Sequence, residues 1–452
     1  MHRKTHKAVQ QYLARYAEPE VQLLANFPDD AFDACVVIPA YQESPAFIGR
    51  FLEAFATRSA LLIVVINQPE HELDPLPQQK LFEHISERSQ QLWQHQHLAL
   101  WQPIAAHCHG LVDVQCPTNI QCRILTICRY SSRMAIPEKQ GVGAARKIGS
   151  DVACQLIDDN KIKCSWIGSS DADATLPKGY FDALLSLKNN NSQSLKTTNT
   201  ERLLYSAATF RFRHDNVKTG TVRLDSNPDT DSLASGDVLA ATQLYEQWLH
   251  YYVAGLAWAE SPYAFYTIGS CLAFDYTCYC QVRGFPKRAA GEDFYLLNKL
   301  AKLGPVQPVS EELVLQARTS TRVPFGTGPA VSEILRKQWQ DDTYLVYDPR
   351  VFAMLKELLA HFRCVFSFVE IDDYAQWLTQ LPDCTQAALA ATGFADAVVK
   401  LLKNNRSEQA FNKQLNAWFD AFRTLKFIHF VEKSHFPPIS LAEAKKISSF
   451  TF

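Results

Sequence analysis

The feature that most constrains this chain is a pair of strand-length runs in which every side chain is apolar. Residues 34–38 (ACVVI) form the first run, residues 61–66 (LLIVVI) form the second, and a helical pattern over 45–58 separates them. A strand that is apolar on both sides is buried on both faces, which is typical of parallel sheets covered by helices. Because parallel neighbours need a long connection, the intervening helix predicts a βαβ unit.

The same alternation continues along the chain. Residues 123–128 and 164–168 predict two further buried strands, and residues 141–157 between them carry the apolar stripe of a helix. Residues 81–92 predict another helix from Leu81, Ile85 and Leu92. We therefore predict an α/β fold with a mostly parallel central sheet flanked by helices.

We expect helical segments before and after this α/β domain in the sequence. We predict a helical segment over 1–33, the α/β domain over 34–329 and a helical region over 330–452. The last region contains an apolar stripe that core packing explains: Phe411, Leu415, Trp418, Phe422 and Leu425. Two polar stretches within the α/β domain, 189–201 and 214–237, predict loops.

Charge and cysteine content narrow the class of protein. The chain has 45 basic and 47 acidic residues, a formal charge of −2, and no block of Lys and Arg, which argues against a protein that binds nucleic acid. Its 12 cysteines include no C-x-x-C pair, and residues 1–20 lack an export signal, so we expect free thiols in the cytoplasm. The longest apolar stretch, 251–274, contains Glu260 and Pro262, which predicts no transmembrane segment and leaves peripheral membrane contact open.

Two aspartates directly follow the strand predicted at 164–168. Residues two apart in an extended backbone point to the same side, so the carboxylates of Asp171 and Asp173 can converge. Carboxylate oxygens suit Mg²⁺ or Mn²⁺, which also take phosphate oxygens and water as ligands. This pair therefore predicts a site for a metal-bound diphosphate, although a solvated turn with an Asp helix cap explains most isolated D-x-D sequences.

A second acidic pair, Glu292 and Asp293, begins the helix that follows Gly291. Acidic residues at a helix start also serve as simple capping groups. A carboxylate at this place has the chemistry of a general base that takes a proton from an acceptor hydroxyl, while a metal holds the leaving group elsewhere.

The start of the helix at 141–157 offers positive charge. Arg146 and Lys147 follow Gly141 and Gly143, and the glycines would let backbone N–H groups approach a phosphate. The full dinucleotide-binding fingerprint is missing, because an arginine stands at its third glycine position. An exposed helix surface is the simpler explanation for this segment taken alone.

Six segments in order resemble the signatures of family 2 glycosyltransferases with the GT-A fold. The resemblance covers residues 34–304, and its segments are VVIPAYQE (36–43), GVGAAR (141–146), SSDAD (169–173), YTIGSCLAFDY (266–276), RGFP (283–286) and GED (291–293). Residues 318–328 (RTSTRVPFGTG) also resemble the tail of a bacterial subgroup of these enzymes. The Q-x-x-R-W motif and the membrane helices of the polysaccharide synthases are absent from the sequence.

The resemblance implies a role for each matching residue. The residues near the nucleotide and its sugar would be Pro39, Tyr41, Glu43, Asn67, Arg146, Asp171, Gly269 and Ser270. The family often has Asp where this chain has Asn67, and the His that completes the metal site in some relatives has no counterpart, so water would complete the coordination. The metal, Mn²⁺ or Mg²⁺, would lie on Asp171 and Asp173, and Asp293 would be the base of an inverting enzyme, with Glu292 beside it.

The sequence thus predicts a metal-dependent hexosyltransferase that moves a sugar from a nucleotide-diphosphate sugar to an acceptor hydroxyl. Arg318 and Arg322 lie in a polar loop and predict a lid on the diphosphate. A nucleotidyltransferase is the alternative enzyme, but it would have a glycine-rich basic loop after the first strand, where this chain has Ala40 to Glu43. A non-catalytic carbohydrate-binding protein on the same fold is the alternative from another class.

Overall fold

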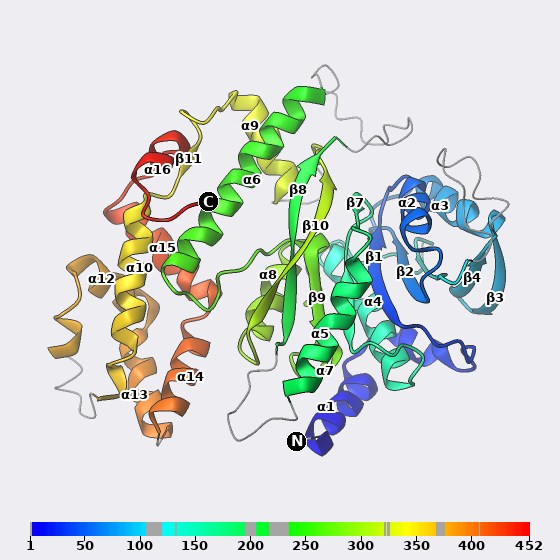
Figure 1. Ribbon diagram of the computed structural model, residues 1–452, viewed down its shortest axis with the longest axis horizontal. Coiled ribbons are helices and arrows are strands. Elements are labelled where there is room, and N and C mark those ends of the chain that lie inside the picture. Colours follow the sequence, from blue (N-terminus) through cyan, green and yellow to red (C-terminus); the bar gives the residue numbers. More distant parts are fainter. Residues whose placement is uncertain are drawn as a thin grey trace. The chain divides into compact units, whose positions relative to one another are not determined.

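The computed structural model describes residues 2–104, 120–131, 133–194, 205–216, 235–320, 322, 326–367, 376–405 and 407–452. The chain divides into two compact units (Figure 1): unit 1 comprises Met1–Leu239 and Thr267–Ser332, and unit 2 comprises Ala240–Tyr266 and Glu333–Phe452. Cys108, Cys116 and most of the two predicted loops lie outside the described residues. The domain division predicted from the sequence, 1–33, 34–329 and 330–452, stays a prediction.

Unit 1 is built on one mixed sheet. Its strands, in the described part of the chain, are β1 (Ala34–Ala40), β2 (Ala60–Asn67), β3 (Ser89–His95), β4 (Leu98–Pro103), β5 (Arg123–Arg129), β6 (Trp166–Ser169), β7 (Ala174–Thr175), β8 (Ala207–Asp215), β9 (Leu272–Asp275) and β10 (Val306–Gln316). They lie in the order β3-β4-β5-β2-β1-β6-β9-β8-β10-β7. Every residue of β1 and β2 is buried, as their apolar sequences predict.

The predicted parallel core is confirmed. Strands β5, β2, β1 and β6 are parallel neighbours, and Pro39 lies within β1 opposite Val65 of β2. The sheet continues on both sides with antiparallel pairs, β3 and β4 at one end and β9 at the other, while β8 and β10 are parallel to each other. The sheet is therefore parallel in its centre and has antiparallel pairs on both sides of that centre.

Helices cover both faces of the sheet. Those described in unit 1 are α1 (His2–Arg15), α2 (Ala46–Phe55), α3 (Leu76–Glu87), α4 (Gly141–Asp158), α5 (Tyr180–Ser194), α7 (Tyr276–Gln281) and α8 (Glu292–Leu300), with 3-10 turns η1 (Pro19–Leu24) and η3 (Gly269–Cys271). Gly149 of α4 packs on Val37 and Val65, while Tyr180 of α5 packs on Gly168. Gly168 is in register with Val36, and neighbours along a strand face opposite sides, so α4 and α5 cover opposite faces.

Two sequence-based element predictions are wrong. Leu92 lies in β3 and not in the helix with Leu81 and Ile85, because α3 ends at Glu87. Residues 189–194, predicted as loop, continue α5 to Ser194. In both places the polar composition obscured the element, since β3 is largely exposed and has few apolar side chains.

A buried ion pair in α4, between Lys147 and Asp151, binds the N-terminal helix α1 to the rest of unit 1. Asp151 is fully buried and accepts hydrogen bonds from Lys147 Nζ (2.8 Å), Tyr12 Oη (2.5 Å), Tyr279 Oη (3.0 Å) and the Glu18 N–H (2.8 Å). Lys147 also donates to Tyr12 Oη. Lys147 therefore anchors α1 against α4 and does not supply charge to a phosphate, which corrects that sequence-based prediction.

Unit 2 is helical. Its elements, in the described residues, include most of α6 (Ser235–Trp258) and the end of α9 (Thr327–Lys337), and then α10 (Pro349–Phe362), η4 (Val365–Ser367), α12 (Asp383–Thr392), α13 (Phe394–Asn404), α14 (Glu408–Trp418), α15 (Ala421–Ser434) and α16 (Leu441–Ile447), with a short sheet of β11 (Leu345–Val346) and β12 (Ile439–Ser440). Tyr251 of α6 packs against Phe352, Phe450 and Phe452. The stripe from Phe411 to Leu425 belongs to two helices, because Asp420 caps a new helix, α15.

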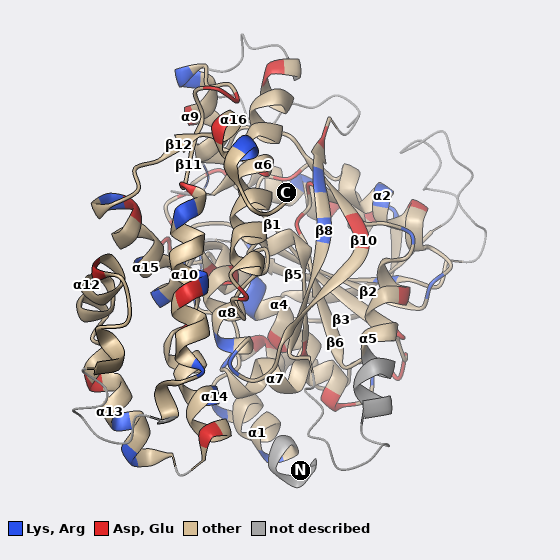
Figure 2. Cartoon of the chain, turned by 60° about the vertical axis from the view of Figure 1, so that its left-hand side comes forward, with Lys and Arg blue, Asp and Glu red and all other residues tan. Residues whose placement is uncertain are grey.

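Charge and thiols in the described residues agree with the composition. Figure 2 shows Lys and Arg interspersed with Asp and Glu along the elements of each unit. The ten cysteines of the described part are all free, and seven of them are buried. No helix among the described residues is long and apolar enough to cross a membrane.

Candidate functional site

The carboxyl ends of the parallel strands gather the sequence-predicted residues of unit 1. Strands β1, β2 and β6 are parallel, so Tyr41 and Glu43 after β1, Asn67 at the end of β2 and Asp171 after β6 lie along one edge of the sheet. Ligands of open α/β sheets bind at this edge. The candidate site therefore has the position that the fold class favours.

Arg146 of α4 is the central side chain of the site. Its guanidinium is 3% exposed and donates to Glu292 Oε1 (2.9 Å), Asp171 Oδ1 (2.7 Å), Ser169 Oγ (3.0 Å) and the Ser170 carbonyl (3.2 Å). Burial acts to lower the pKa of Arg146, but the carboxylates of Asp171 and Glu292 outweigh it and raise that pKa. Arg146 thus stays charged and joins the end of β6 to the start of α8.

Two glycines make room for this arrangement. A Cβ at Gly269 would lie 2.2 Å from Arg146 Nη2, and a Cβ at Gly143 would lie 2.4 Å from the Pro286 carbonyl oxygen. The Gly143 N–H donates to the Arg288 carbonyl (3.0 Å). Gly143 therefore serves close packing of α4 on residues 286–288, and its N–H is not presented to a phosphate as the sequence suggested.

Asp293 lies at the first turn of α8, beside Glu292. The helix begins after Gly291, whose φ of 73° is left-handed, a conformation that favours glycine. Burial, together with Glu292 and Asp171, raises the pKa of Asp293 to about 7, against the opposing effects of the Phe294 N–H and Arg146. The Phe294 N–H donates to Asp293 Oδ1 (2.6 Å). A carboxyl with this pKa can exchange a proton near neutral pH.

Glu43 is surrounded by arginines. Arg318 donates to both of its carboxylate oxygens (3.0 and 3.3 Å), and Arg322 donates to Glu43 Oε1 (2.7 Å) and to the Tyr41 carbonyl (2.7 Å). Burial acts to raise the pKa of Glu43, but the two arginines hold it below its usual value. The loop that carries Arg318 and Arg322 is thus attached to the end of β1.

Arg318 also connects Glu43 to the second aspartate of the D-x-D pair. Arg318 Nη2 lies 2.8 Å from Asp173 Oδ2, and Arg50 donates to the Ala172 carbonyl (2.8 Å). Arg50, the first basic residue after β1, lies on α2 and is not among the site residues predicted from the sequence. Its position after the strand was the available signal.

The donor set at Asp171 and Asp173 fits a divalent metal that shares its coordination with a phosphate. The two side chains are 32% and 20% exposed, and each has one oxygen in an ion pair, Asp171 Oδ1 with Arg146 and Asp173 Oδ2 with Arg318. The other oxygen of each accepts no hydrogen bond from the described residues. No group of three or more His, Cys, Asp or Glu side chains able to hold a metal occurs in the described part of the chain. A metal here would depend on phosphate oxygens and water, which suits Mg²⁺ or Mn²⁺.

The remaining predicted residues occupy varied positions. Asn67 is 6% exposed, and its Oδ1 has no hydrogen-bond partner in the described residues. The Tyr41 hydroxyl donates to Glu72 Oε2 (3.3 Å), and Ser270 is buried in η3. The unpartnered Asn67 oxygen is an acceptor at the strand edge, where a ligand N–H would satisfy it.

Comparison with known proteins adds little. No family model matches the chain, and no curated protein matches it at a significant level. Among solved structures, the chain is similar to the mannosyltransferase PcManGT from Pyrobaculum calidifontis in complex with GDP-Man and Mn2+, at 16% identity over 93% of this chain and 96% of that chain, with a TM-score of 0.29. So loose a superposition carries no argument about this chain.

Proposed function

We propose that unit 1 is the catalytic unit of a metal-dependent glycosyltransferase that transfers a hexose from a nucleotide-diphosphate sugar to an acceptor hydroxyl. The observation that carries this proposal is the buried Arg146, which joins Asp171 of the D-x-D pair to Glu292, beside Asp293 with its pKa near 7. Three segments far apart in sequence meet there. The GT-A fold, membership of family 2 and inversion at the anomeric carbon are parts of the same proposal.

Asp293 is the general base in this proposal. Its carboxylate takes the proton of the acceptor hydroxyl as that oxygen forms a bond to the anomeric carbon. The bond between the anomeric carbon and the diphosphate oxygen breaks, and the nucleoside diphosphate leaves with the electron pair. The Phe294 N–H engages Oδ1 of Asp293, which favours Oδ2 as the atom that receives the proton.

Arg146 acts as a positioning residue. Two of its hydrogen bonds hold Asp171 and Glu292, two more go to the end of β6, and Gly269 leaves the space that its guanidinium needs. Glu292 and Asp171 both accept hydrogen bonds from Arg146, and burial together with the charge of Glu292 raises the pKa of Asp293. The carboxylate that binds the donor and the carboxylate that accepts the proton are therefore held in one fixed arrangement.

The diphosphate would be bound by side chains of the D-x-D pair and of the neighbouring loops. Asp171 and Asp173 would hold the metal, which when bound stabilises the negative charge of the leaving diphosphate. Arg318 and Arg322 lie against Asp173 and Glu43 and supply positive charge at that place. Pro39, Tyr41, Asn67 and Ser270 would border the nucleotide and the sugar.

A thermal-shift panel of nucleoside diphosphates and nucleotide sugars, each with and without Mn²⁺, tests the proposal. A ligand that binds only the folded chain raises its stability, by about 2.7 kcal/mol at a concentration one hundred times its dissociation constant. We expect one nucleotide to stabilise the chain only with Mn²⁺, and the matching nucleotide sugar to be turned over.

Asp173→Asn is the matched variant for this panel, and Asp342→Asn, on an exposed residue, is its control. The first variant should lose the Mn²⁺-dependent shift and the second should keep it. A wild-type chain that no nucleotide stabilises would favour the non-catalytic carbohydrate-binding alternative.

A further inference from the structure

Arg318 lies between the proposed metal site and the end of β1. Its Nη2 atom is 2.8 Å from Asp173 Oδ2 and 3.0 Å from Glu43 Oε1, and its Nη1 atom is 3.3 Å from Glu43 Oε2. The arginine side chain is 26% exposed, and those of Asp173 and Glu43 are 20% and 12% exposed, so water and salt screen these contacts only in part. Arg318 therefore compensates both carboxylates at once.

The sheet brings Arg318 to this place. Strand β10 pairs with β7, with Leu315 in register with Ala174, and the Gln316 N–H donates to the Asp173 carbonyl (3.2 Å). Arg318 follows two residues after Gln316. The contact between Arg318 and the D-x-D pair is thus set by the backbone pairing next to it.

The carboxylates near this contact are balanced by guanidinium groups. Four of each kind meet at the candidate site: Arg50, Arg146, Arg318 and Arg322 with Glu43, Asp171, Asp173 and Glu292. Asp293 has a pKa of about 7 and is about half ionised at neutral pH. A divalent cation therefore meets little excess negative charge here, and on Asp173 it would share one carboxylate with Arg318, whose charge repels it.

The pKa of Asp173 reflects the weight of Arg318. Burial raises this pKa, Asp171 and Glu43 add to the rise, and Arg318 opposes it more strongly than Arg322 does. Loss of the Arg318 charge would leave the carboxylates of Asp171, Asp173 and Glu43 to repel one another with less compensation. A metal ion on Asp173 would relieve that repulsion.

We propose that Arg318 competes with the divalent metal for Asp173 and moves to the diphosphate when the donor binds. The diphosphate supplies the negative charge that the balanced site lacks, and its oxygens accept charge-assisted hydrogen bonds from a guanidinium. This inference rests on the proposed function, from which it takes both ligands. The metal and the diphosphate are then thermodynamically coupled, because each binds weakly alone and strengthens the binding of the other.

A titration with Mn²⁺ alone tests the competition. The full chain is titrated at about pH 8, where carboxyl groups are ionised, and electron paramagnetic resonance measures the free Mn²⁺. Arg318→Gln removes the charge and should lower the dissociation constant for Mn²⁺ about tenfold, whereas Arg318→Lys keeps the charge and should change it less than about twofold. Arg322→Gln removes the same charge beside Glu43 and should lower the constant less than Arg318→Gln does.

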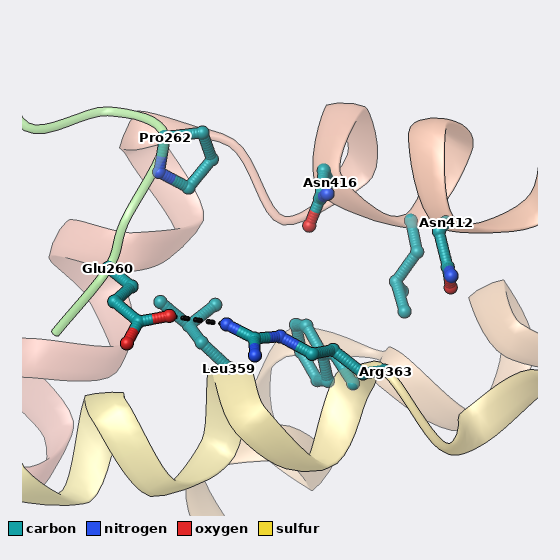
Figure 3. A pocket seen from close by; sticks show the side chains of 8 residues that line it. Glu260, Pro262, Leu359, Arg363, Asn412 and Asn416 are labelled. Atoms are coloured by element: carbon teal, nitrogen blue, oxygen red, sulfur yellow. Dashed lines mark hydrogen bonds and ion pairs between the residues drawn. The ribbon is translucent and has the colours of Figure 1, made fainter. Parts of the chain in front are cut away.

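Arg363→Gln is the control for the loss of charge. Figure 3 shows this arginine paired with Glu260 beside a pocket of unit 2, and both side chains are more than half exposed. Its removal should leave the dissociation constant for Mn²⁺ unchanged. Circular dichroism establishes that each variant folds, and Arg318→Met decides if Arg318→Gln does not fold. The competition is overturned if the charge-removing variants of Arg318 bind Mn²⁺ no more tightly than the wild type, or if none of them binds it.

The nucleotide panel tests the movement of Arg318 to the diphosphate. With Mn²⁺ present, Arg318→Gln should weaken the binding of the stabilising nucleotide about tenfold, measured by isothermal titration, so that the two affinities change in opposite directions. Equal nucleotide affinity in the variant and the wild type would overturn this step. If Arg318→Gln tightens Mn²⁺ binding while no nucleotide stabilises the wild type, the proposed glycosyltransferase function fails and the competition at Asp173 stands.

Discussion

Arg146 is the residue on which the candidate site of unit 1 depends. It is buried with two carboxylates around it, so its charge is compensated inside the protein and does not require a ligand. Removal of one partner from a buried ion pair leaves an uncompensated charge, which is costly. The pairing of Arg146 with Asp171 therefore combines a structural role with the proposed positioning of the metal ligand.

The proposed base gives the first prediction. Asp293→Asn keeps the size of the side chain but cannot accept a proton at neutral pH, so turnover should fall about 10²- to 10⁴-fold. Steady-state kinetics measures this loss, and thermal shift with the nucleotide should show donor binding retained. Asp342→Asn is the control. Near-native turnover of the Asp293 variant would show that another group takes the proton.

The raised pKa of Asp293 gives a pH dependence. Burial, together with Glu292 and Asp171, raises this pKa to about 7, while the Phe294 N–H and Arg146 oppose the shift. Only the ionised carboxylate is a base, so kcat should fall about tenfold for each pH unit below 7. A pH–rate profile measures this, and a profile without a break near 7 would contradict it.

The same carboxyl affects stability with a definite sign. Its folded-state pKa lies above the unfolded value of about 3.9, so between those two values the folded chain binds the extra proton. The contribution of Asp293 to the free energy of unfolding therefore falls as pH rises through this window. Asp293→Asn should remove that slope in urea unfolding.

Gly269 provides a test at the same place without any charge change. A methyl group there would lie 2.2 Å from Arg146 Nη2, so Gly269→Ala must displace the guanidinium. Overpacking of a buried site costs about 1–3 kcal/mol, and donor affinity should fall as well. Urea unfolding measures the cost. Gly236→Ala, where no atom lies within 4 Å of the added Cβ, should be neutral or slightly stabilising; equal effects of the two would refute the steric argument.

Among the elements, the buried parallel strands were the best predicted from sequence. Continuous apolar runs in β1 and β2 leave no alternative to burial on both faces, and both strands match the sequence patterns within two residues at each end. The exposed strand β3 was missed because its side chains are mostly polar, and pairing with β4, which is set by tertiary contacts, forms it.

Side-chain partners were less predictable than strands. Arg146 and Lys147 are adjacent on α4, and the sequence offered both as positive charge for a diphosphate, with an exposed helix surface as the alternative. In the structure one binds Asp171 and the other binds Asp151, since successive residues on a helix point about 100° apart. Asp151 and Tyr12, which are 139 residues apart, are brought together only by the packing of α1 on α4.

The contacts of Asp151 predict that the packing of α1 on α4 stabilises unit 1. Asp151→Ala would leave the buried Lys147 charge and two tyrosine hydroxyls without their acceptor, which should cost about 3–5 kcal/mol. Asp158→Ala, at an exposed hydrogen bond to Gln10 on the same two helices, should cost less than about 1 kcal/mol. Denaturant unfolding compares the two, and equal losses would show that the buried pair is not what holds α1.

On the scale of the whole molecule, unit 2 is discontinuous in sequence. Its first segment, Ala240–Tyr266, packs with residues that come after Glu333, as Tyr251 and Gly255 do with Phe352. A chain that ends at Ser332 would therefore expose the apolar side chains of α6. We expect that truncated chain to aggregate, measured by size-exclusion chromatography.

The control for the truncation replaces residues 240–266 with a Gly/Ser linker of equal length in the same shortened chain. This change removes the unpartnered apolar surface, and it should restore a soluble species with cooperative unfolding. A truncated chain that is soluble without the linker would show that α6 does not need its unit 2 partners.

A segment of unit 1 separates the two segments of unit 2 in the sequence, and this separation affects folding during translation. Ala240 leaves the ribosome 93 residues before Glu333, the first residue of the segment that completes its unit (333 − 240 = 93). At about 5–20 residues per second, the apolar nascent helix waits roughly 5–20 s for its partners. Over that interval it presents Leu244, Tyr251 and Leu256 to the cell, so chaperone capture during translation is the expected fate of α6.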